Sequence, residues 1–327
     1  MLNIGILGIW HVHTDDYVRH VREGNLAAIT AIWDEDPEAG RVWARENGVE
    51  FAADLDMLLA RPNIDAVLCN APTTCHAQVL VKAAKAGKHI FTEKLLAPTV
   101  AECEAICQAV EAAGVVCVVS LPLLSSPWVQ YTKQLIESGK LGRVTGARMR
   151  RSHSGVSDGW LPERWFDVSR SGGGAMMDLG AHPVYVLAYL LGAPVRVTGL
   201  MTSPYGTSSD ENAITLVEFE GGALATCETG FITFGVPDLL EVYGTEGAVF
   251  VRDGVVNVFT KSMQQLGMAV GAPARLPEAL PSPLENFVHA CLGGFVPQNV
   301  GPRDALAMTQ IIETAYRSNE QGKTITL

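Results

Sequence analysis

The residues best suited to chemistry in this 327-residue chain lie in the segment 171–182, which reads Ser-Gly-Gly-Gly-Ala-Met-Met-Asp-Leu-Gly-Ala-His. Asp178 and His182 stand four positions apart, so on a helical turn they share a face and can act on one bound molecule. The glycines at 172–174 let the backbone turn tightly and approach a ligand closely. A carboxylate beside an imidazole fixes the histidine tautomer and suits proton transfer near neutral pH. The competing interpretation is a polar helix start, in which Asp178 caps the helix and His182 has a structural role.

Composition favours a two-domain intracellular protein. The chain is 48% hydrophobic and carries a net charge of −11, which disfavours nucleic acid or an anionic membrane as a partner. The longest apolar run, 115–124, is about half the length needed to cross a bilayer. The seven cysteines follow no disulfide framework, and the first residues resemble a strand rather than a targeting segment. We therefore expect reduced thiols and a cytoplasmic location.

The first third of the chain alternates between strand and helix patterns. Strands are expected over 4–9, 27–33, 64–69, 89–92 and 115–120, and helices over 14–23, 38–47, 77–86 and 100–113. Repeated βαβ units of this spacing predict an α/β protein whose N-terminal Rossmann domain, residues 1–122, has a doubly wound parallel sheet.

The pattern changes after Pro122. Strand-like runs at 147–151, 214–219, 223–229 and 239–243 follow one another closely and are separated by glycine turns. This spacing predicts a second α/β domain, residues 123–327, with a large, mostly antiparallel open sheet.

The first strand and the turn after it predict a dinucleotide site. Gly8 stands where the first glycine of a Gly-x-Gly-x-x-Gly fingerprint belongs, but Trp10 and His13 occupy the second and third positions. Asp34 ends the second strand, 21 residues beyond His13. A carboxylate there accepts both adenosine ribose hydroxyls and repels a 2′-phosphate, which predicts NAD rather than NADP. The alternative role for Asp34 is a helix N-cap before Pro37.

The His11-Val12-His13 segment has a different possible role. With Asp15 and Asp16 nearby, it could hold a metal ion as in amidohydrolase-like barrels. The strand–helix alternation stops near residue 120, however, short of the eight units that such a barrel requires. The sequence therefore predicts no metal site.

Three segments together resemble the glucose–fructose oxidoreductase and inositol dehydrogenase (Gfo/Idh/MocA) family. They are Asn-Ala-Pro-Thr-Thr-Cys-His at 70–76, Ala-Gly-Lys-His-Ile-Phe-Thr-Glu-Lys at 86–94, and the glycine-rich segment 171–182. The resemblance implies a Rossmann domain followed by an α/β domain whose open sheet often mediates oligomers. It also implies hydride transfer between a nicotinamide and a carbon of a sugar, cyclitol or related polyol.

The resemblance assigns roles to individual residues. Lys94 would contact the nicotinamide ribose and the reacting hydroxyl, His182 would take the hydroxyl proton, and Asp178 would orient His182 or bind a neighbouring hydroxyl. Alcohol oxidation needs such a base, a cation for the developing alkoxide and a hydride acceptor. The residues expected at the cofactor are Gly8, Ile9, Trp10, His11, Asp34, Asn70, Ala71, Pro72, His76, Glu93 and Lys94.

The substrate is expected to be a neutral or acidic polyhydroxylated ring. Aromatic side chains suit the apolar face of a sugar, and arginine or histidine suits its hydroxyls or a carboxylate. The residues expected to contact it are Arg151, His153, Trp160, Trp165, Asp178, His182 and Tyr185.

The chain departs from the family pattern at several positions. Leu95 replaces the proline of Glu-Lys-Pro, which makes a cis peptide bond unexpected because such bonds are rare without proline. Tyr185 stands where many members have a second aspartate. Pro183, directly after His182, must begin a helix or kink one.

Two other functions remain open at this point, together with a prediction of assembly. One is a regulatory protein of the same fold that binds nucleotide or sugar without turnover. The other is an NADP-dependent reductase of a carbonyl or imine, which Asp34-Glu35-Asp36 disfavours. We also expect a homo-oligomer, a dimer or tetramer, that associates through the exposed face of the second sheet, with 213–219 and 223–229 on that face.

Overall fold

The structure, a computed structural model, describes residues 1–271 and 273–327 and divides into two compact units. The first unit comprises Met1–Ser120 and Pro281–Thr309, and the second comprises Leu121–Leu280 and Gln310–Leu327. The chain thus leaves the first unit close to the expected boundary at 122. It returns to that unit for 281–309, which the sequence analysis had placed in the second domain. The return has a packing cause, since Phe287 is fully buried with its ring centroid 5.8 Å from that of Phe91.

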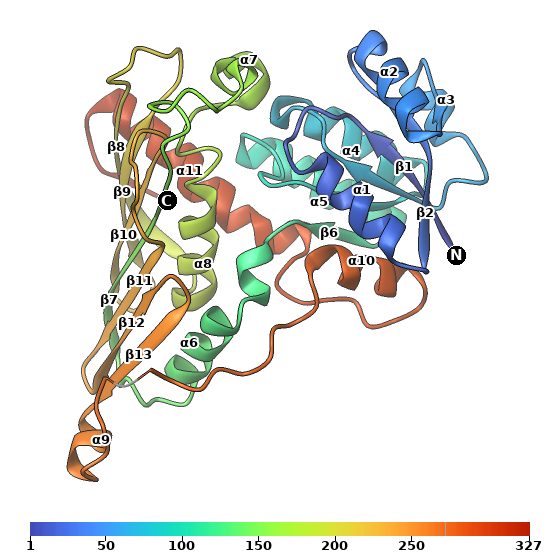
Figure 1. Ribbon diagram of the computed structural model, residues 1–327. Coiled ribbons are helices and arrows are strands. Elements are labelled where there is room, and N and C mark those ends of the chain that lie inside the picture. Colours follow the sequence, from blue (N-terminus) through green and yellow to red (C-terminus); the bar gives the residue numbers. More distant parts are fainter. Residues whose placement is uncertain (272) are drawn as a thin grey trace. The chain divides into compact units, whose positions relative to one another are not determined.

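The first unit is built on a six-stranded sheet in the order β3-β2-β1-β4-β5-β6, and every paired strand in it is parallel (Figure 1). This order confirms the predicted Rossmann sheet, and the direction of winding reverses at β1 and β4, where ligands of such sheets bind. The strands are β1 (Leu2–Leu7), β2 (Ala27–Trp33), β3 (Glu50–Phe51), β4 (Ala66–Cys69), β5 (His89–Thr92) and β6 (Cys117–Val119). The helices are α1 (Thr14–Glu23), α2 (Pro37–Asn47), α3 (Leu55–Leu59), α4 (His76–Lys85), α5 (Val100–Ala113) and α10 (Pro283–Cys291).

Local signals explain where the elements of the first unit begin and end. Thr99 and Glu102 form a capping box at the start of α5, and Gly114 ends that helix in the left-handed conformation with φ 64°. Gly48 ends α2 in the same way, with φ 68°. The β4 strand is buried along its whole length, as expected for a parallel strand covered on both faces.

The second unit contains an eight-stranded sheet in the order β13-β12-β11-β7-β10-β9-β8-β14. All neighbours are antiparallel except β7 and β10, so the predicted mostly antiparallel sheet is confirmed. Its strands are β7 (Val144–Ser152), β8 (Pro194–Thr202), β9 (Asn212–Phe219), β10 (Leu224–Gly230), β11 (Leu239–Gly244), β12 (Gly247–Arg252), β13 (Val255–Thr260) and β14 (Ile325–Thr326).

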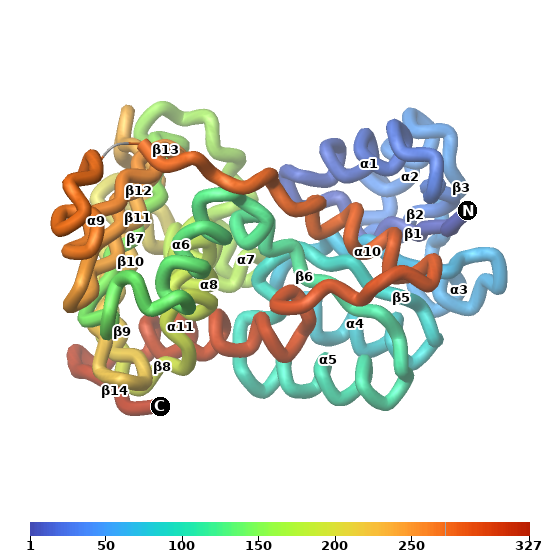
Figure 2. Tube along the Cα trace, turned by 90° about the horizontal axis from the view of Figure 1, so that it is seen from below, coloured from blue at the N-terminus to red at the C-terminus, as the bar shows by residue number. Residues whose placement is uncertain are grey.

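Helices cover one face of this second sheet. In both views α6 (Pro127–Glu137), α8 (Ala181–Leu191) and the C-terminal part of α11 (Pro302–Gln321) lie on the same side (Figures 1 and 2). The short helices α7 (Val168–Ser171) and α9 (Lys261–Gln265) complete the unit. Burial along β9 alternates accordingly: Val217 and Phe219 are buried, whereas Ile214 and Leu216 are exposed.

No helix in the described part of the chain is both long and apolar enough to span a membrane. All seven cysteines are free thiols, as the sequence analysis expected. Burial raises the pKa of Cys69 and of Cys227 to about 12, so these two thiols stay protonated at neutral pH.

Candidate active site

The turn between β1 and α1 requires a glycine at its first position. Gly8 has φ 84°, and a Cβ atom added there would lie 2.6 Å from the Ala71 Cα. Both the conformation and the close approach of the two loops therefore exclude a side chain. Trp10, at the second fingerprint position, is 4% exposed, and His13 is the residue before α1.

The Asp34 carboxylate is fixed at the carboxyl end of β2. It is 4% exposed; Oδ2 accepts the Ile9 N–H at 2.8 Å and Oδ1 accepts the Asp36 N–H at 2.7 Å. A carboxylate in this position can accept the hydroxyls of an adenosine ribose. Asp36, rather than Asp34, caps α2, because its side chain accepts the N–H groups of Glu38 and Ala39.

Asn70 offers a buried amide at the end of β4. Its carbonyl oxygen accepts the His11 N–H at 3.1 Å, and the residue is 0% exposed. Within the described chain, its side-chain Oδ1 and Nδ2 have no hydrogen-bond partner. A buried amide without a partner in the protein is suited to hydrogen-bond with polar groups of a bound molecule. Gly8, Asp34 and Asn70 are therefore together suited to bind a dinucleotide.

His76 connects the loops that follow β4 and β5. Its Nδ1 lies 2.8 Å from the Leu95 carbonyl oxygen, and its Nε2 lies 3.1 Å from that of Ala71. Burial lowers the pKa of His76. Pro72 is also buried, beside Ala71 in the loop after β4. The Lys94–Leu95 peptide bond is cis, so the expectation drawn from the missing proline was wrong; Leu95 is 1% exposed and its carbonyl is bound by His76.

Polar side chains from the β1–α1 turn and from α1 surround the carboxylate of Glu93, which directly follows β5. Its Oε1 lies 2.9 Å from His13 Nδ1 and 3.7 Å from His11 Nδ1, and it accepts a hydrogen bond from the Tyr17 hydroxyl. Its Oε2 accepts the backbone N–H of Lys94 at 3.0 Å. Burial opposes ionisation, but the neighbouring His11, His13 and Lys94 charges hold the pKa of Glu93 well below its usual range. Sequence reasoning missed Tyr17, although it stands four residues after His13, one helical turn beyond the residue that precedes α1.

In the second unit, Asp210 anchors the glycine-rich segment. Its carboxylate accepts the Gly174 N–H at 2.9 Å, the Met176 N–H at 2.7 Å and the Tyr316 hydroxyl at 2.6 Å. A Cβ on Gly174 would lie 2.1 Å from the Asp210 carbonyl oxygen, so the approach requires glycine. Burial raises the pKa of Asp210, against the effect of these donors. Asp178 belongs to this turn, with its N–H bonded to the Gly174 carbonyl, and does not lie on α8.

His182 is the second residue of α8, and Pro183 is the third. A proline in the first turn costs no intrahelical hydrogen bond, so Pro183 begins the helix rather than kinking it. The His182 side chain is 8% exposed, and its Nδ1 lies 3.0 Å from the Tyr185 hydroxyl oxygen. That oxygen also accepts the Leu123 N–H at 3.0 Å. Tyr185, expected at the substrate, thus fixes the orientation of the imidazole.

His153, directly after β7, is fixed by one backbone hydrogen bond and two ring contacts. Its Nδ1 accepts the Gly155 N–H at 3.1 Å, so the neutral ring carries its proton on Nε2. The ring stacks on Phe231 with centroids 4.9 Å apart and lies 4.7 Å from the Trp160 ring, which is 56% exposed. Nε2 of His153 and the face of Trp160 are therefore suited to a hydroxylated ring.

The other residues expected at the substrate have mixed surroundings. Trp165 is buried, at 4% exposed, and Arg151 Nε lies 3.8 Å from Asp238 Oδ2. Burial lowers the pKa of His153, the Asp178 charge raises it, and the Arg151 charge lowers it.

Two sequence-family models match the chain. Residues 2–121 match the oxidoreductase family with an NAD-binding Rossmann fold, and residues 129–250 match the GFO/IDH/MocA C-terminal domain. The chain belongs to the GFO/IDH/MocA oxidoreductase family. The resemblance seen in the sequence is thereby confirmed, and so is the assignment as an oxidoreductase.

Several characterised members of the GFO/IDH/MocA family are similar over most of their length. The scyllo-inositol 2-dehydrogenase (NAD(+)) of Bacillus subtilis (strain 168) is 28% identical over 310 residues, covering 91% of this chain and 86% of the relative. The D-xylose 1-dehydrogenase [NADP(+)] of Haloarcula marismortui is 26% identical over 340 residues, covering 100% of this chain and 93% of the relative. The structure of a levoglucosan dehydrogenase in complex with NADH and levoglucosan superposes with a TM-score of 0.84 at 23% identity, covering 100% and 99% of the two chains.

The charges around His153 lead to a prediction of opposite signs for two substitutions. Asp178→Asn should lower the pKa of His153 further, because it removes a charge that raises this pKa, whereas Arg151→Gln should raise it. NMR titration of the imidazole resonances measures both shifts. An unchanged pKa in Asp178→Asn would show that the Asp178 charge does not reach this ring.

Proposed function

We propose that this family member is an NAD-preferring dehydrogenase that oxidises a hydroxyl-bearing carbon of a sugar, glycoside, cyclitol or sugar acid. The observation that carries the proposal is the Asp34 carboxylate, fixed at the end of β2 in a Rossmann unit that otherwise fits a dinucleotide. The inositol and levoglucosan dehydrogenases among its relatives support the class of substrate. The nicotinamide supplies the hydride acceptor, and the protein supplies the groups that bind, orient and deprotonate the alcohol.

The preference for NAD rests on charge. A 2′-phosphate beside the ionised Asp34 would place like charges together in a buried site, whereas ribose hydroxyls can donate to its oxygens. A relative that uses NADP(+) shows that the family as a whole does not fix this choice.

Asp34→Ala should weaken NAD binding and narrow the difference in affinity between NAD and NADP. Calorimetric titration of both cofactors measures this, with Asp36→Ala as the control because Asp36 caps α2 instead. Wild-type protein that binds NADP more tightly than NAD would refute the preference.

For catalysis, we propose Lys94 as the cation that stabilises the alkoxide and His182 as the base, with Asp178 orienting the reacting groups or binding a neighbouring hydroxyl. Lys94 is 4% exposed after β5. If His182 accepts a proton at Nε2, its Nδ1 must already carry one and donate it to the Tyr185 oxygen. That oxygen has two lone pairs, one for this donor and one for the Leu123 N–H. The arrangement is therefore compatible with a base whose other nitrogen is held by a tyrosine.

His182→Ala should lower kcat by about a hundred- to ten-thousand-fold, the usual contribution of a general base, while leaving NAD affinity unchanged. Steady-state turnover on the best substrate and separate NAD titration measure the two effects. His289→Ala, an exposed histidine on α10, serves as the control. Turnover close to wild type in His182→Ala would place the base elsewhere.

The substrate proposal assigns the ring-binding surface to His153 and Trp160, with Arg151 available to a carboxylate. Trp165, being buried, would support this surface from below rather than contact the ligand. Trp160→Ala should raise KM and change kcat little, since it removes a contact made equally to substrate and transition state. If KM is unchanged for every substrate that turns over, this assignment fails.

We also propose that a second copy of the chain covers the outer face of the second sheet. In Figures 1 and 2 no described helix of the second unit lies on that face, and it exposes Leu200, Leu216 and Leu224 at 67%, 52% and 62%. Ion pairs of Arg196 with Glu218 and of Arg148 with Glu228 lie on the same sheet.

A double substitution, Leu216→Glu with Leu224→Glu, should dissociate the oligomer into monomers, because it places charges on the sheet face that the second copy would cover. Light scattering at micromolar concentration measures the mass, and Leu266→Glu, at a leucine that is 75% exposed after α9, is the control. A monomeric wild-type protein would refute the assembly.

A further inference from the structure

We propose that His11, His13 and Glu93 bind one divalent transition-metal ion, with Zn²⁺ as the probe. The three side chains come from the β1–α1 turn and the end of β5, all within the first unit. Among the described residues, they form the one group of three histidine, cysteine or carboxylate side chains whose ligand atoms lie within 4.8 Å of one another. The inference goes beyond the proposed dehydrogenase function and does not depend on it.

The separations fit a common ion. Two ligand atoms that are each about 2.1 Å from a metal lie about 3.0 Å apart at a right angle and about 3.4 Å apart at a tetrahedral angle. Glu93 Oε1 lies 2.9 Å from His13 Nδ1 and 3.7 Å from His11 Nδ1. The carboxylate thus lies near ligand spacing from each imidazole, and all three ligand atoms lie within 4.8 Å of one another. The backbone N–H of His13 donates a long hydrogen bond of 3.3 Å to His11 Nδ1.

The surroundings have the features of a metal site. Glu93 is held from outside by the Tyr17 hydroxyl and the Lys94 N–H, as ligating carboxylates usually are. Tyr17 in turn lies 2.7 Å from the Ser120 hydroxyl. The side chains of His11 and Glu93 are 4% and 2% exposed, whereas that of His13 is 43% exposed, so an ion has a route of entry. Two histidines and one carboxylate leave a coordination position for water or an oxygen of a bound molecule.

The carboxylates that the sequence analysis considered for this site do not contribute. Asp16 forms an ion pair with Arg19 at 2.6 Å, and the Asp15 side chain faces the Trp43 indole nitrogen at 3.5 Å. The third ligand comes instead from Glu93, 80 residues beyond His13. Only the fold brings it to the two histidines.

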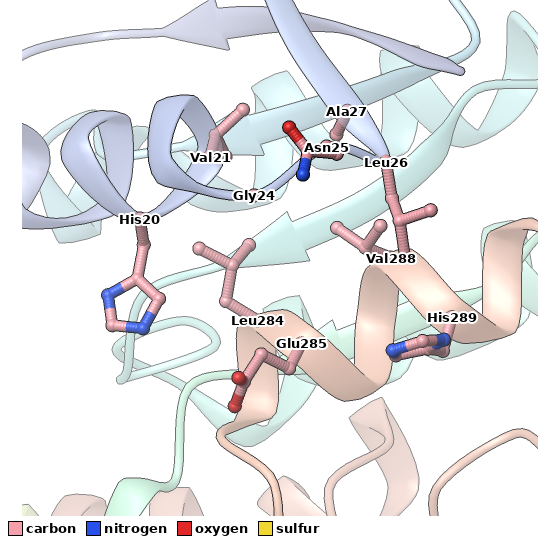
Figure 3. Close-up of a pocket in the computed structure, with 10 residues that line it drawn as sticks. All are labelled: His20, Val21, Gly24, Asn25, Leu26, Ala27, Leu284, Glu285, Val288 and His289. Atoms are coloured by element: carbon pink, nitrogen blue, oxygen red, sulfur yellow. The ribbon is translucent and has the colours of Figure 1, made fainter.

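A second grouping in the first unit provides an internal control. His20, Glu285 and His289 lie around a hollow of about 180 Å³ beside α1 and α10, which Leu284 and Val288 also line (Figure 3). These three polar side chains are exposed, and they do not form a group with ligand atoms within 4.8 Å in the described structure. Substitution of His20 therefore tests whether retained metal is bound by exposed histidines instead of by His11, His13 and Glu93.

The experiment uses the full-length chain, purified without a metal-affinity tag and freed of metal with a chelator. After addition of Zn²⁺ and desalting, bound metal is measured by mass spectrometry of the elements, and the midpoint of thermal unfolding is measured with and without the ion. We expect one zinc per chain and a higher midpoint for wild type and for His20→Ala, because an ion that binds only the folded state stabilises it. His11→Ala and Glu93→Gln should lose both effects.

If Glu93→Gln does not fold, His13→Ala replaces it, since that half-exposed side chain can be removed without opening the core. Wild type that retains no more zinc than His11→Ala, or shows no rise in midpoint, would overturn the proposal. Neither readout requires turnover, so this result is separable from failure of the dehydrogenase function. If His20→Ala loses the zinc that wild type retains, the metal binds at the surface, and this result would also overturn the proposal.

Discussion

Burying a carboxylate costs free energy unless hydrogen-bond donors surround its oxygens, and the structure meets this constraint where the candidate site is built. In the second unit, Asp210 receives two backbone N–H groups and the Tyr316 hydroxyl, and these bonds fix the turn that carries Asp178 and leads into His182. In the first unit, Asp34 receives the N–H groups of Ile9 and Asp36. In both places a side chain remote in sequence sets the backbone from which functional groups project.

The fold was largely predictable where local signals are strong. The bounds of α1, β2, β5 and α5 agree with those expected from hydrophobic periodicity and capping residues. The two-residue strand β3 and the return of 281–309 to the first unit were not foreseen. Both depend on pairing or packing with distant residues, such as Phe287 against Phe91, which no local pattern encodes.

The candidate site was predictable as a set of motifs but not as a set of contacts. Gly8, Asp34 and Asn70 came from the fingerprint and from strand ends, and the loops that carry them do meet in the first unit. Asp210 and Tyr316 were missed because their partners are 34 to 142 residues away along the chain. Asp178 and His182 do not share a helical face as expected, because Asp178 lies in a turn and His182 lies on the helix α8 that follows it. There, the Tyr185 hydroxyl oxygen lies 3.0 Å from His182 Nδ1, and the Asp178 charge raises the pKa of His153.

The central claim is that the first unit binds NAD through Asp34 and the buried amide of Asn70, and a crystal structure of the protein with NAD⁺ tests it most directly. The account predicts that both adenosine ribose hydroxyls donate to the Asp34 carboxylate. It also predicts that a polar group of the cofactor reaches Oδ1 or Nδ2 of Asn70. A bound cofactor whose ribose hydroxyls contact other residues and not Asp34 would contradict it.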